Sequence, residues 1–313
     1  MHSFIRAVSF LCLFLFSGTR AYEIHDSCAL PTKLLVRQAA NQAFDMARLA
    51  LQELQASPRD PDVNRLLGLL FAKKDEDPTT MDVRRLRDIY DNILLAAAED
   101  EARPHPTDTS PLQNVMIYCN EDRFQKRADG TWVDTGMNSI YLAWYYGSCV
   151  SHSLAGRAVF ENHPSQITIC PWLFQWARQR KYKKYADMQG GIAKAWTKRT
   201  LQATLRALGR EDGIDKMRLL DQTILHELTH TLVGGRSLDV KVAGLLGSEK
   251  SYGWKNCLAL AKNGGMHPED DKLPRTALDN ADSLALFGLA VKLLREQTPL
   301  YVLENGGLTN RRP

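Results

Sequence analysis

The chain has 313 residues, of which 44% are hydrophobic and 24% are charged, and its formal net charge is +4 at pH 7. This length and apolar content are sufficient for a folded core, and they exclude a chain that stays disordered for lack of hydrophobic residues. The small net charge gives no reason to expect nucleic acid as a partner.

Residues 1–21 predict a secretory signal peptide. Arg6 precedes the apolar run from Ala7 to Phe16, and small residues follow up to Ala21, after which we expect cleavage. The apolar run is too short for a membrane span, which needs about 20 residues. Because Arg6 and Arg20 would be removed, the mature chain would be nearly neutral. We therefore expect a secreted, extracellular protein that has no membrane partner.

The N-terminal part of the mature chain is predicted to be helical. Apolar and small residues recur every three to four positions from Leu34 to Leu54, and two further helices are predicted at Pro61 to Ala72 and Met81 to Ala98. Prolines among acidic and hydroxyl residues predict a loop over residues 99–113. We interpret this loop as a surface connection inside one domain rather than as a domain boundary or a processing site.

A small sheet and a second helical region are predicted after the loop. The strand-like stretches are Val115 to Tyr118, Thr131 to Val133 and Ile167 to Ile169. The pattern is helical again from Met217, and Gly234-Gly235 is expected to stop that helix shortly after His230. We expect a single α+β domain over residues 22–313, mainly helical up to about residue 98 and with its chemistry between residues 114 and 313.

The segment His226-Glu227-Leu228-Thr229-His230 carries the clearest chemical signal. Residues four positions apart project from one face of a helix, so His226 and His230 can bind one Zn²⁺ ion. Glu227 is offset from that face, and its carboxylate reaches a water on the metal rather than the metal itself. Zinc lowers the pKa of such a water towards 7, and a nearby carboxylate can accept its proton as the water attacks a peptide carbonyl. The segment predicts two zinc ligands and a general base.

A catalytic zinc ion also needs a third protein ligand and one open position. Asp239, Glu249 and Asp282 all follow the histidines in the chain, and each has a carboxylate that could serve as the ligand. Composition does not choose among them.

The HELTH segment and two later elements resemble the aspzincin metallopeptidases, the family of deuterolysins and lysine-specific metalloendopeptidases. The later elements are Ser251-Tyr252-Gly253-Trp254 and Asn280-Ala281-Asp282-Ser283-Leu284-Ala285-Leu286-Phe287. Cys28, Tyr118-Cys119-Asn120 and Ile169-Cys170-Pro171 also occur in the order typical of the family. The resemblance covers most of the mature chain, loosely outside the motifs. It implies a mainly helical zincin-like domain with a small β-sheet beside the HELTH helix, and the hydrolysis of internal peptide bonds.

The family's third zinc ligand is the Asp of a Gly-Thr-x-Asp-x-x-Tyr-Gly stretch, which is not intact in this chain. Alignment on Tyr252-Gly253 places Glu249 at the ligand position, whereas the distance from His230 favours Asp239 and requires an insertion before Tyr252. We prefer Asp239, because the family uses a short carboxylate soon after the helix and a longer loop costs little.

The resemblance implies further roles. Tyr252 would donate a hydrogen bond to the oxyanion of the tetrahedral intermediate, and Asp282 would help shape the pocket for the residue after the scissile bond. Lysine-selective relatives have an acidic residue three positions after that Asp, where this chain has Ala285, so strict lysine selectivity is not expected. The family also implies two disulfides and one unpaired thiol, namely Cys28–Cys119, Cys149–Cys170 and Cys257.

Two other interpretations remain open. A secreted zinc-binding protein without turnover, acting as a binding or effector protein, would have a closed site with four protein ligands. A binder of nucleic acid or anionic surfaces would use the basic and aromatic stretch from Arg178 to Tyr185, although a solvated helix face explains that stretch more simply. The preferred interpretation is a monomer with one Zn²⁺ ion, whose partner is a protein or peptide substrate.

Overall fold

The structure is a computed structural model that describes residues 22–97, 114–136, 139–141, 149, 155–159, 165–179, 187, 213–244 and 247–313. The predicted signal peptide, the loop predicted at 99–113 and most of the basic stretch 178–185 lie outside these residues. Among the helices that the structure describes, none combines the length and the apolar character that crossing a membrane requires.

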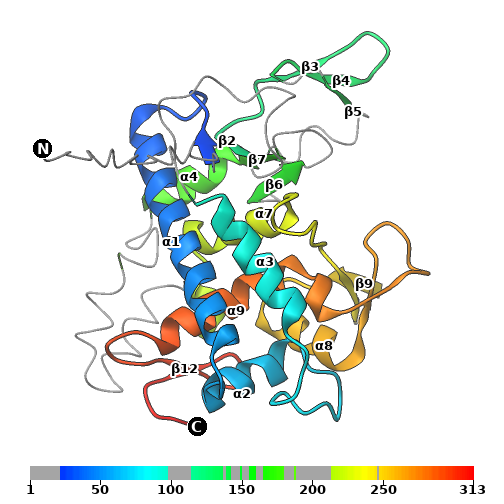
Figure 1. The fold of residues 1–313 in the computed structure, drawn as a ribbon. Coiled ribbons are helices and arrows are strands. Elements are labelled where there is room, and N and C mark those ends of the chain that lie inside the picture. The colour runs from blue at the N-terminus through cyan, green and yellow to red at the C-terminus, as the bar shows by residue number, and fades with distance from the viewer. Residues whose placement is uncertain are drawn as a thin grey trace, which may run out of the picture.

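The N-terminal part is mainly helical, as predicted. Its helices are α1 (Leu30–Gln55), α2 (Pro61–Leu70) and α3 (Arg84–Leu95). Helix α2 begins behind Asp60, whose carboxylate accepts a hydrogen bond from the Asp62 backbone N–H and so caps the helix. Helix α3 is shorter than predicted, because Asp82 accepts a hydrogen bond from the Arg84 backbone N–H just outside its first turn. The long helix α1 packs against α3, α7 and α9 (Figure 1).

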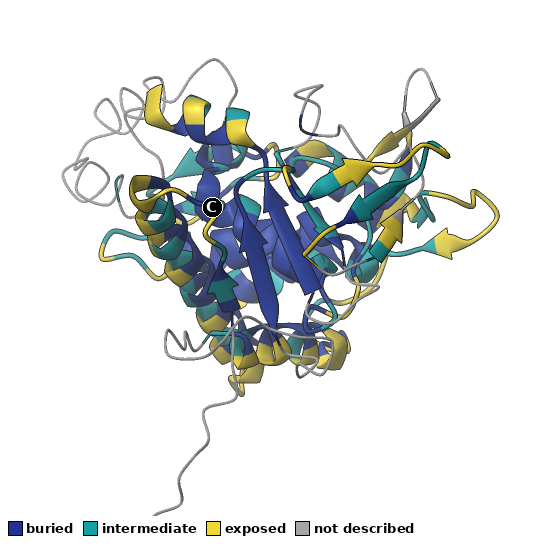
Figure 2. Cartoon of the chain, turned by 90° about the horizontal axis from the view of Figure 1, so that it is seen from above, coloured by how far each residue is buried: buried dark blue, intermediate teal, exposed yellow. Residues whose placement is uncertain are grey.

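A four-stranded sheet lies beside these helices, with the strand order β1-β2-β7-β6. Its strands are β1 (Tyr22–Ile24), β2 (Val115–Tyr118), β7 (Ser165–Ile169) and β6 (Gly156–Val159). The first three are parallel, and β6 is antiparallel to β7 at the edge. Strands β2 and β7 are buried along their whole length, at the centre of the view in Figure 2. The edge strand β6 packs against helix α7, so the sheet borders the HELTH helix.

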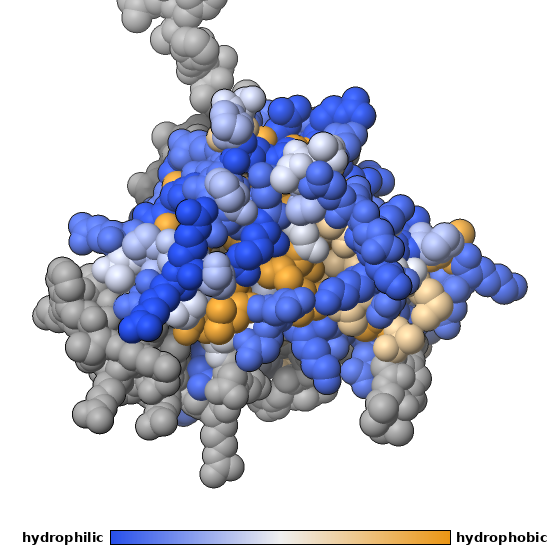
Figure 3. All heavy atoms as spheres, turned by 90° about the horizontal axis from the view of Figure 1, so that it is seen from below, coloured by the Kyte–Doolittle hydropathy of each residue, from blue (hydrophilic) through white to orange (hydrophobic). Residues whose placement is uncertain are grey.

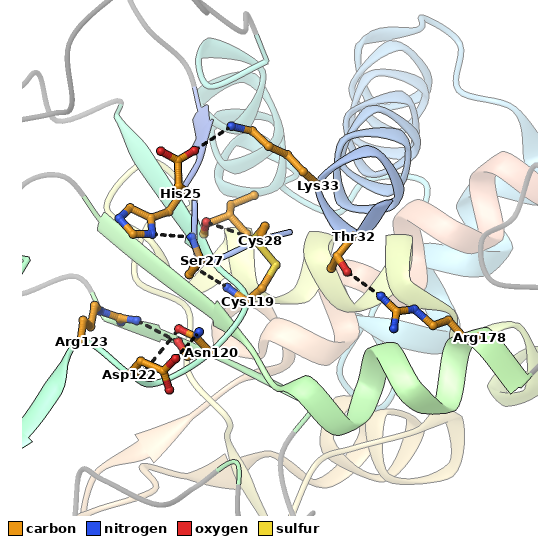
Figure 4. The surroundings of a disulfide bond; sticks show 12 residues. His25, Ser27, Cys28, Thr32, Lys33, Cys119, Asn120, Asp122, Arg123 and Arg178 are labelled. Carbon is orange, nitrogen blue, oxygen red and sulfur yellow. Dashed lines mark hydrogen bonds and ion pairs between the residues drawn. A yellow bond between two sulfur atoms is a disulfide. The ribbon is translucent and has the colours of Figure 1, made fainter. Parts of the chain in front are cut away.

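The described residues form two disulfides, of which one connects the helical part to the sheet region and the other lies within the sheet region. Cys28–Cys119 joins the chain before α1 to the residue after β2 (Figure 4), and Cys149–Cys170 ends directly before α4 (Pro171–Gln179). Cys257 is free and buried. These pairings confirm those implied by the resemblance. Structural disulfides are typical of oxidising compartments, so both bonds are consistent with a secreted protein.

The C-terminal part mixes helices and short strands, so the expectation of continued helix after Met217 is wrong in part. Helix α7 spans Leu220–His230 and ends before the predicted glycine stop, because Thr231 already has an extended backbone. Helix α9 (Ala281–Leu294) forms the centre of the core, and all 14 of its residues are buried. The remaining helical elements are η2 (Gly213–Met217), α8 (Trp254–Asn263) and η3 (Ala277–Asp279).

Three further sheets complete the described fold, which agrees with the expected α+β class. The sheet that follows α7 has the order β11-β10-β8-β9, formed by Pro274–Arg275, Gly265–Met266, Lys241–Gly244 and Gly247–Lys250. The others are β3 (Phe124–Lys126), β4 (Trp132–Asp134) and β5 (Ser139–Tyr141), and the pair β12 (Tyr301–Val302) and β13 (Leu308–Thr309).

The outer surface carries mainly hydrophilic side chains on the face shown in Figure 3. The large hydrophobic side chains that are exposed among the described residues come from separate parts of the chain, namely α1, the end of α3, β5 and the loop before β11 (Leu30, Leu34, Leu95, Ile140 and Leu273). Single exposed hydrophobic side chains of this kind are normal for folded proteins.

Candidate metal centre

A tight turn after helix α7 brings the chain back to the two histidines. At Gly234 a Cβ atom would lie 2.0 Å from the Leu228 carbonyl oxygen, so only glycine fits there, and Gly235 has a positive φ of +79°. The Ser237 backbone N–H then donates to the Thr229 carbonyl at 2.9 Å. The chain is thereby led alongside the last turn of the helix.

Asp239 is fixed by hydrogen bonds on both of its sides. The backbone of Leu238 forms a β-bridge with Asn280. The side-chain oxygen of Asn280 also accepts a hydrogen bond from the Val240 backbone N–H, at 3.2 Å. The Val240 carbonyl accepts hydrogen bonds from the backbone N–H and the hydroxyl of Ser251. Residues distant in sequence therefore hold the Asp239 carboxylate beside helix α7.

The side chains of His226, His230 and Asp239 converge on one point, and they form the group of described residues that could hold a metal ion. The His226 and His230 Nε2 atoms are 3.2 Å apart, and Asp239 Oδ1 lies 3.4 Å and 3.3 Å from them, respectively. A tetrahedral zinc ion with bonds of about 2.0–2.1 Å places its ligand atoms about 3.3–3.4 Å apart. Asp239 Oδ1 is buried and has no hydrogen-bond partner. The spacing of the donor atoms is therefore compatible with one shared metal ion.

The other nitrogen of each imidazole faces an oxygen atom. His230 Nδ1 lies 2.6 Å from the Ser237 carbonyl oxygen, so this nitrogen carries the proton and Nε2 is left with its lone pair. His226 Nδ1 lies 3.3 Å from Asp282 Oδ1, an ion-pair distance at which the hydrogen bond is not well aligned. Such outer partners orient histidines for metal binding.

Burial and neighbouring charges change the ionisation of the site before any ion binds. Burial lowers the pKa of His226, but the carboxylates of Asp239 and Asp282 outweigh burial and raise that pKa to about 10. Burial alone would raise the pKa of Asp239, yet the two imidazoles bring it well below its usual range. The pKa of Asp282 is also lowered, because the Arg218 guanidinium at 2.7 Å more than offsets burial. The site therefore keeps its carboxylates ionised.

Glu227 is buried next to the converging ligands. Its side chain makes no hydrogen bond or ion pair with any other residue that the structure describes, and burial raises the pKa of its carboxyl. Gly156 on the edge strand β6 leaves the space that this carboxyl occupies, because a Cβ atom there would lie 2.9 Å from Glu227 Oε1. Burial of an acid without a partner costs folding free energy, and such groups are typical of functional sites.

The remaining predicted residues take different places. Glu249 is exposed on strand β9, opposite Val242, and does not belong to the converging group. Tyr252 lies at the centre, with its hydroxyl donating to Asp239 Oδ2 at 2.6 Å. Asp282 is fully buried, and its oxygens face Arg218, His226 and the Gly253 backbone N–H. Any effect of Asp282 on a substrate is therefore indirect, through His226 and the start of helix α8.

Sequence reasoning missed Lys250, Arg218 and Gly156. Lys250 Nζ lies 2.9 Å from Asp239 Oδ2 and 3.2 Å from the Tyr252 hydroxyl. Its position two residues before Tyr252, on the same side of an extended segment, was a usable signal. Arg218 and Gly156 have no local signal, because each acquires its role from a contact with a residue distant in sequence.

Comparisons of the chain with known protein families, with curated proteins and with solved structures each found no match. The functional argument therefore depends on the residues of this chain.

Proposed function

We propose that this protein is a secreted zinc-dependent metalloendopeptidase that hydrolyses internal peptide bonds. The observation that carries the proposal is the triangle of His226 Nε2, His230 Nε2 and Asp239 Oδ1, with sides of 3.2–3.4 Å, beside the buried carboxyl of Glu227. Two imidazoles and one carboxylate are a donor set that suits zinc. The resemblance of the HELTH, Ser-Tyr-Gly-Trp and Asn-Ala-Asp-Ser segments to the aspzincins supports the same function.

The metal would be held by His226, His230 and Asp239. A zinc ion bound there would act as a Lewis acid on a water molecule and on the substrate carbonyl. Among the described residues, the converging group supplies three ligands, which is the number found in catalytic zinc sites, whereas structural sites are closed by four. This count favours an enzyme over a zinc-binding protein without turnover.

Glu227 would act as the general base and then as the general acid. Burial raises the pKa of Glu227, which brings it closer to the value that suits a general base working near neutral pH. Glu227 would accept a proton from the attacking water and deliver the proton to the leaving amine. Tyr252 keeps its proton, since burial and the Asp239 carboxylate raise its pKa. Its hydroxyl would have to turn from Asp239 towards the substrate oxygen to stabilise the oxyanion.

The test is cleavage of an unstructured protein such as casein by the purified secreted protein, with and without a zinc chelator. The parent is compared with Glu227→Gln and with Glu249→Gln, a matched change at an exposed glutamate. We expect the chelator to stop cleavage, Glu227→Gln to reduce it by about 10²–10⁴-fold, and Glu249→Gln to leave it unchanged. Cleavage that survives both the chelator and Glu227→Gln would contradict the proposal. Zinc binding without any cleavage by the parent would favour the non-enzymatic alternative.

A further inference from the structure

The two oxygens of the Asp239 carboxylate have opposite surroundings. Oδ2 accepts hydrogen bonds from the Tyr252 hydroxyl at 2.6 Å and from Lys250 Nζ at 2.9 Å. Oδ1 faces the two histidine Nε2 atoms and has no hydrogen-bond partner. A carboxylate can bind a metal ion through one oxygen or through both. In this site, only one oxygen is available.

Lys250 has no evident role in stabilising the fold. Its side chain is 44% exposed, and ion pairs of this exposure contribute little to folding. It lies directly opposite Lys241 in the β8–β9 pairing, an arrangement of like charges that is unfavourable. Each lysine nevertheless has its own partner, because Lys241 pairs with Asp271 at 3.2 Å. The contact of Lys250 with Asp239 therefore calls for an explanation at the metal centre.

We propose that Lys250 and Tyr252 together restrict Asp239 to binding the metal through a single oxygen. This inference rests on the proposed zinc site and adds a positioning residue, Lys250, to it. Binding of the metal through both oxygens would require Oδ2 to give up its hydrogen bonds to the ammonium and the hydroxyl. Held through Oδ1 alone, Asp239 occupies one coordination position and leaves another for water and substrate.

Electrostatics shows which measurement is informative. An ammonium group close to a bound cation repels it, so removal of Lys250 does not weaken metal binding through charge. The proposed effect of Lys250 is on the coordination geometry, and a measurement of metal affinity alone would not detect that effect. A metal ion whose visible absorption reports coordination number is therefore the appropriate probe. Co²⁺ serves this purpose, because its four-coordinate complexes absorb visible light much more strongly than its complexes of higher coordination number.

The experiment loads the full-length mature protein with Co²⁺ and records the visible spectrum of the parent, Lys250→Met, Tyr252→Phe and the double variant. Lys241→Met is the matched control, since it removes the opposite lysine and its ion pair without touching Asp239. Far-UV circular dichroism and the melting temperature of the metal-free proteins verify folding. We expect strong absorption for the parent and for Lys241→Met, weaker absorption for each single variant, and loss of most of it in the double variant. We expect Lys250→Arg, which keeps a positive charge at this position, to retain the parental spectrum.

The outcomes separate this inference from the function on which it rests. If the parent takes up no Co²⁺ or Zn²⁺, both are overturned. If the parent binds Co²⁺ and the folded double variant shows the parental spectrum, only the role of Lys250 and Tyr252 is overturned. Equal loss of absorption in Lys241→Met and Lys250→Met would also overturn that role, because it would reflect a general disturbance of the hairpin.

Discussion

Two buried charge clusters in this protein are built in opposite ways. In the first, the Arg123 guanidinium donates to Asp134 Oδ2 at 2.9 Å, and all three of its nitrogens have acceptors, which also include the Asn120 carbonyl, Gln166 Oε1 and Thr168 Oγ1. The other Asp134 oxygen accepts the Gly136 backbone N–H. In the second, at the candidate metal centre, Asp239 Oδ1 is buried without a hydrogen-bond partner, and the buried Glu227 side chain has no hydrogen bond or ion pair among the residues that the structure describes.

This contrast distinguishes a cluster that stabilises the fold from a cluster that can bind a ligand. A buried charged group costs folding free energy unless it is paired, so the Arg123–Asp134 ion pair, in which every guanidinium nitrogen and both carboxylate oxygens have partners, needs no ligand. A cluster in which atoms of ligand type remain unpaired and converge has unused binding capacity. The Arg123 cluster connects the sheet of β3, β4 and β5 to strand β7, whereas the cluster around Asp239 has the donor atoms to hold a metal ion. The following changes test this difference, from the largest expected effect to the smallest.

Asp134→Asn should be strongly destabilising and independent of metal. It removes the counter-charge of Arg123, whose side chain is 6% exposed, and loss of one partner of a buried ion pair costs about 3–5 kcal/mol. Urea denaturation with and without Zn²⁺ measures the free energy of unfolding. The exposed Asp122→Asn is the control. A loss below about 1 kcal/mol would show that the ion pair of Arg123 with Asp134 contributes no more to stability than an exposed ion pair does.

Gly156→Ala should impair the proposed reaction and spare the fold. The new methyl group would meet the flexible end of Glu227, at 2.9 Å from Oε1, so the glutamate moves and the strand does not. A displacement of about 1 Å costs a catalytic group roughly 10²-fold in rate. Peptide cleavage should fall by that factor while zinc content and the urea midpoint stay unchanged. Full activity in this variant would show that Glu227 does not need its present position.

Zinc affinity should rise with pH over a wide range. Zinc binds only the neutral imidazole, and the carboxylates beside His226 raise its pKa to about 10 in the metal-free protein. Binding therefore releases a proton at neutral pH, and affinity should increase about tenfold per pH unit. Competition with a chromophoric chelator between about pH 6.5 and 8.5 measures the slope. A slope near zero would contradict a raised pKa.

The raised pKa of His226 also predicts how the stability of the metal-free protein depends on pH. Because the folded pKa of His226 is raised, its contribution to stability is fully present below the unfolded pKa of about 6.5 and is lost as pH rises through about 10. Asp282→Asn removes one of the two carboxylates that cause the shift, so the pH dependence of both stability and zinc affinity should become weaker. If the pH dependence were unchanged, Asp239 alone would account for the raised pKa of His226.

The part of the site that the sequence could predict is the part encoded by a single helix. His226, Glu227 and His230 follow from helical periodicity, and their placement needs only α7. Asp239 could not be selected over Glu249 from the residues alone, because its position depends on the turn at Gly234 and on the pairing of Leu238 with Asn280. The pairing with Asn280 brings together residues that are distant in sequence, so no local pattern reports it.

The fold shows the same division. The long amphipathic helix α1 and the apolar strand β2 are near their predicted bounds, because each has a strong pattern of its own. The short strands β8 and β10 were not predicted, since strands of a few residues exist only through pairing with one another. Lys250 lies on β9, which pairs with β8, and Gly156 lies on β6, which pairs with β7. Neither pairing was predicted, so the roles of both residues were missed.

The central claim is that His226, His230 and Asp239 form the metal site, and the most direct test is zinc content after dialysis against limiting Zn²⁺. Elemental analysis of the parent, Asp239→Ala and Glu249→Ala compares the two carboxylates that the sequence left open. The account predicts one zinc ion per chain in the parent and in Glu249→Ala, and loss of zinc in Asp239→Ala. Retention of zinc by a folded Asp239→Ala variant, or its loss in Glu249→Ala alone, would contradict it.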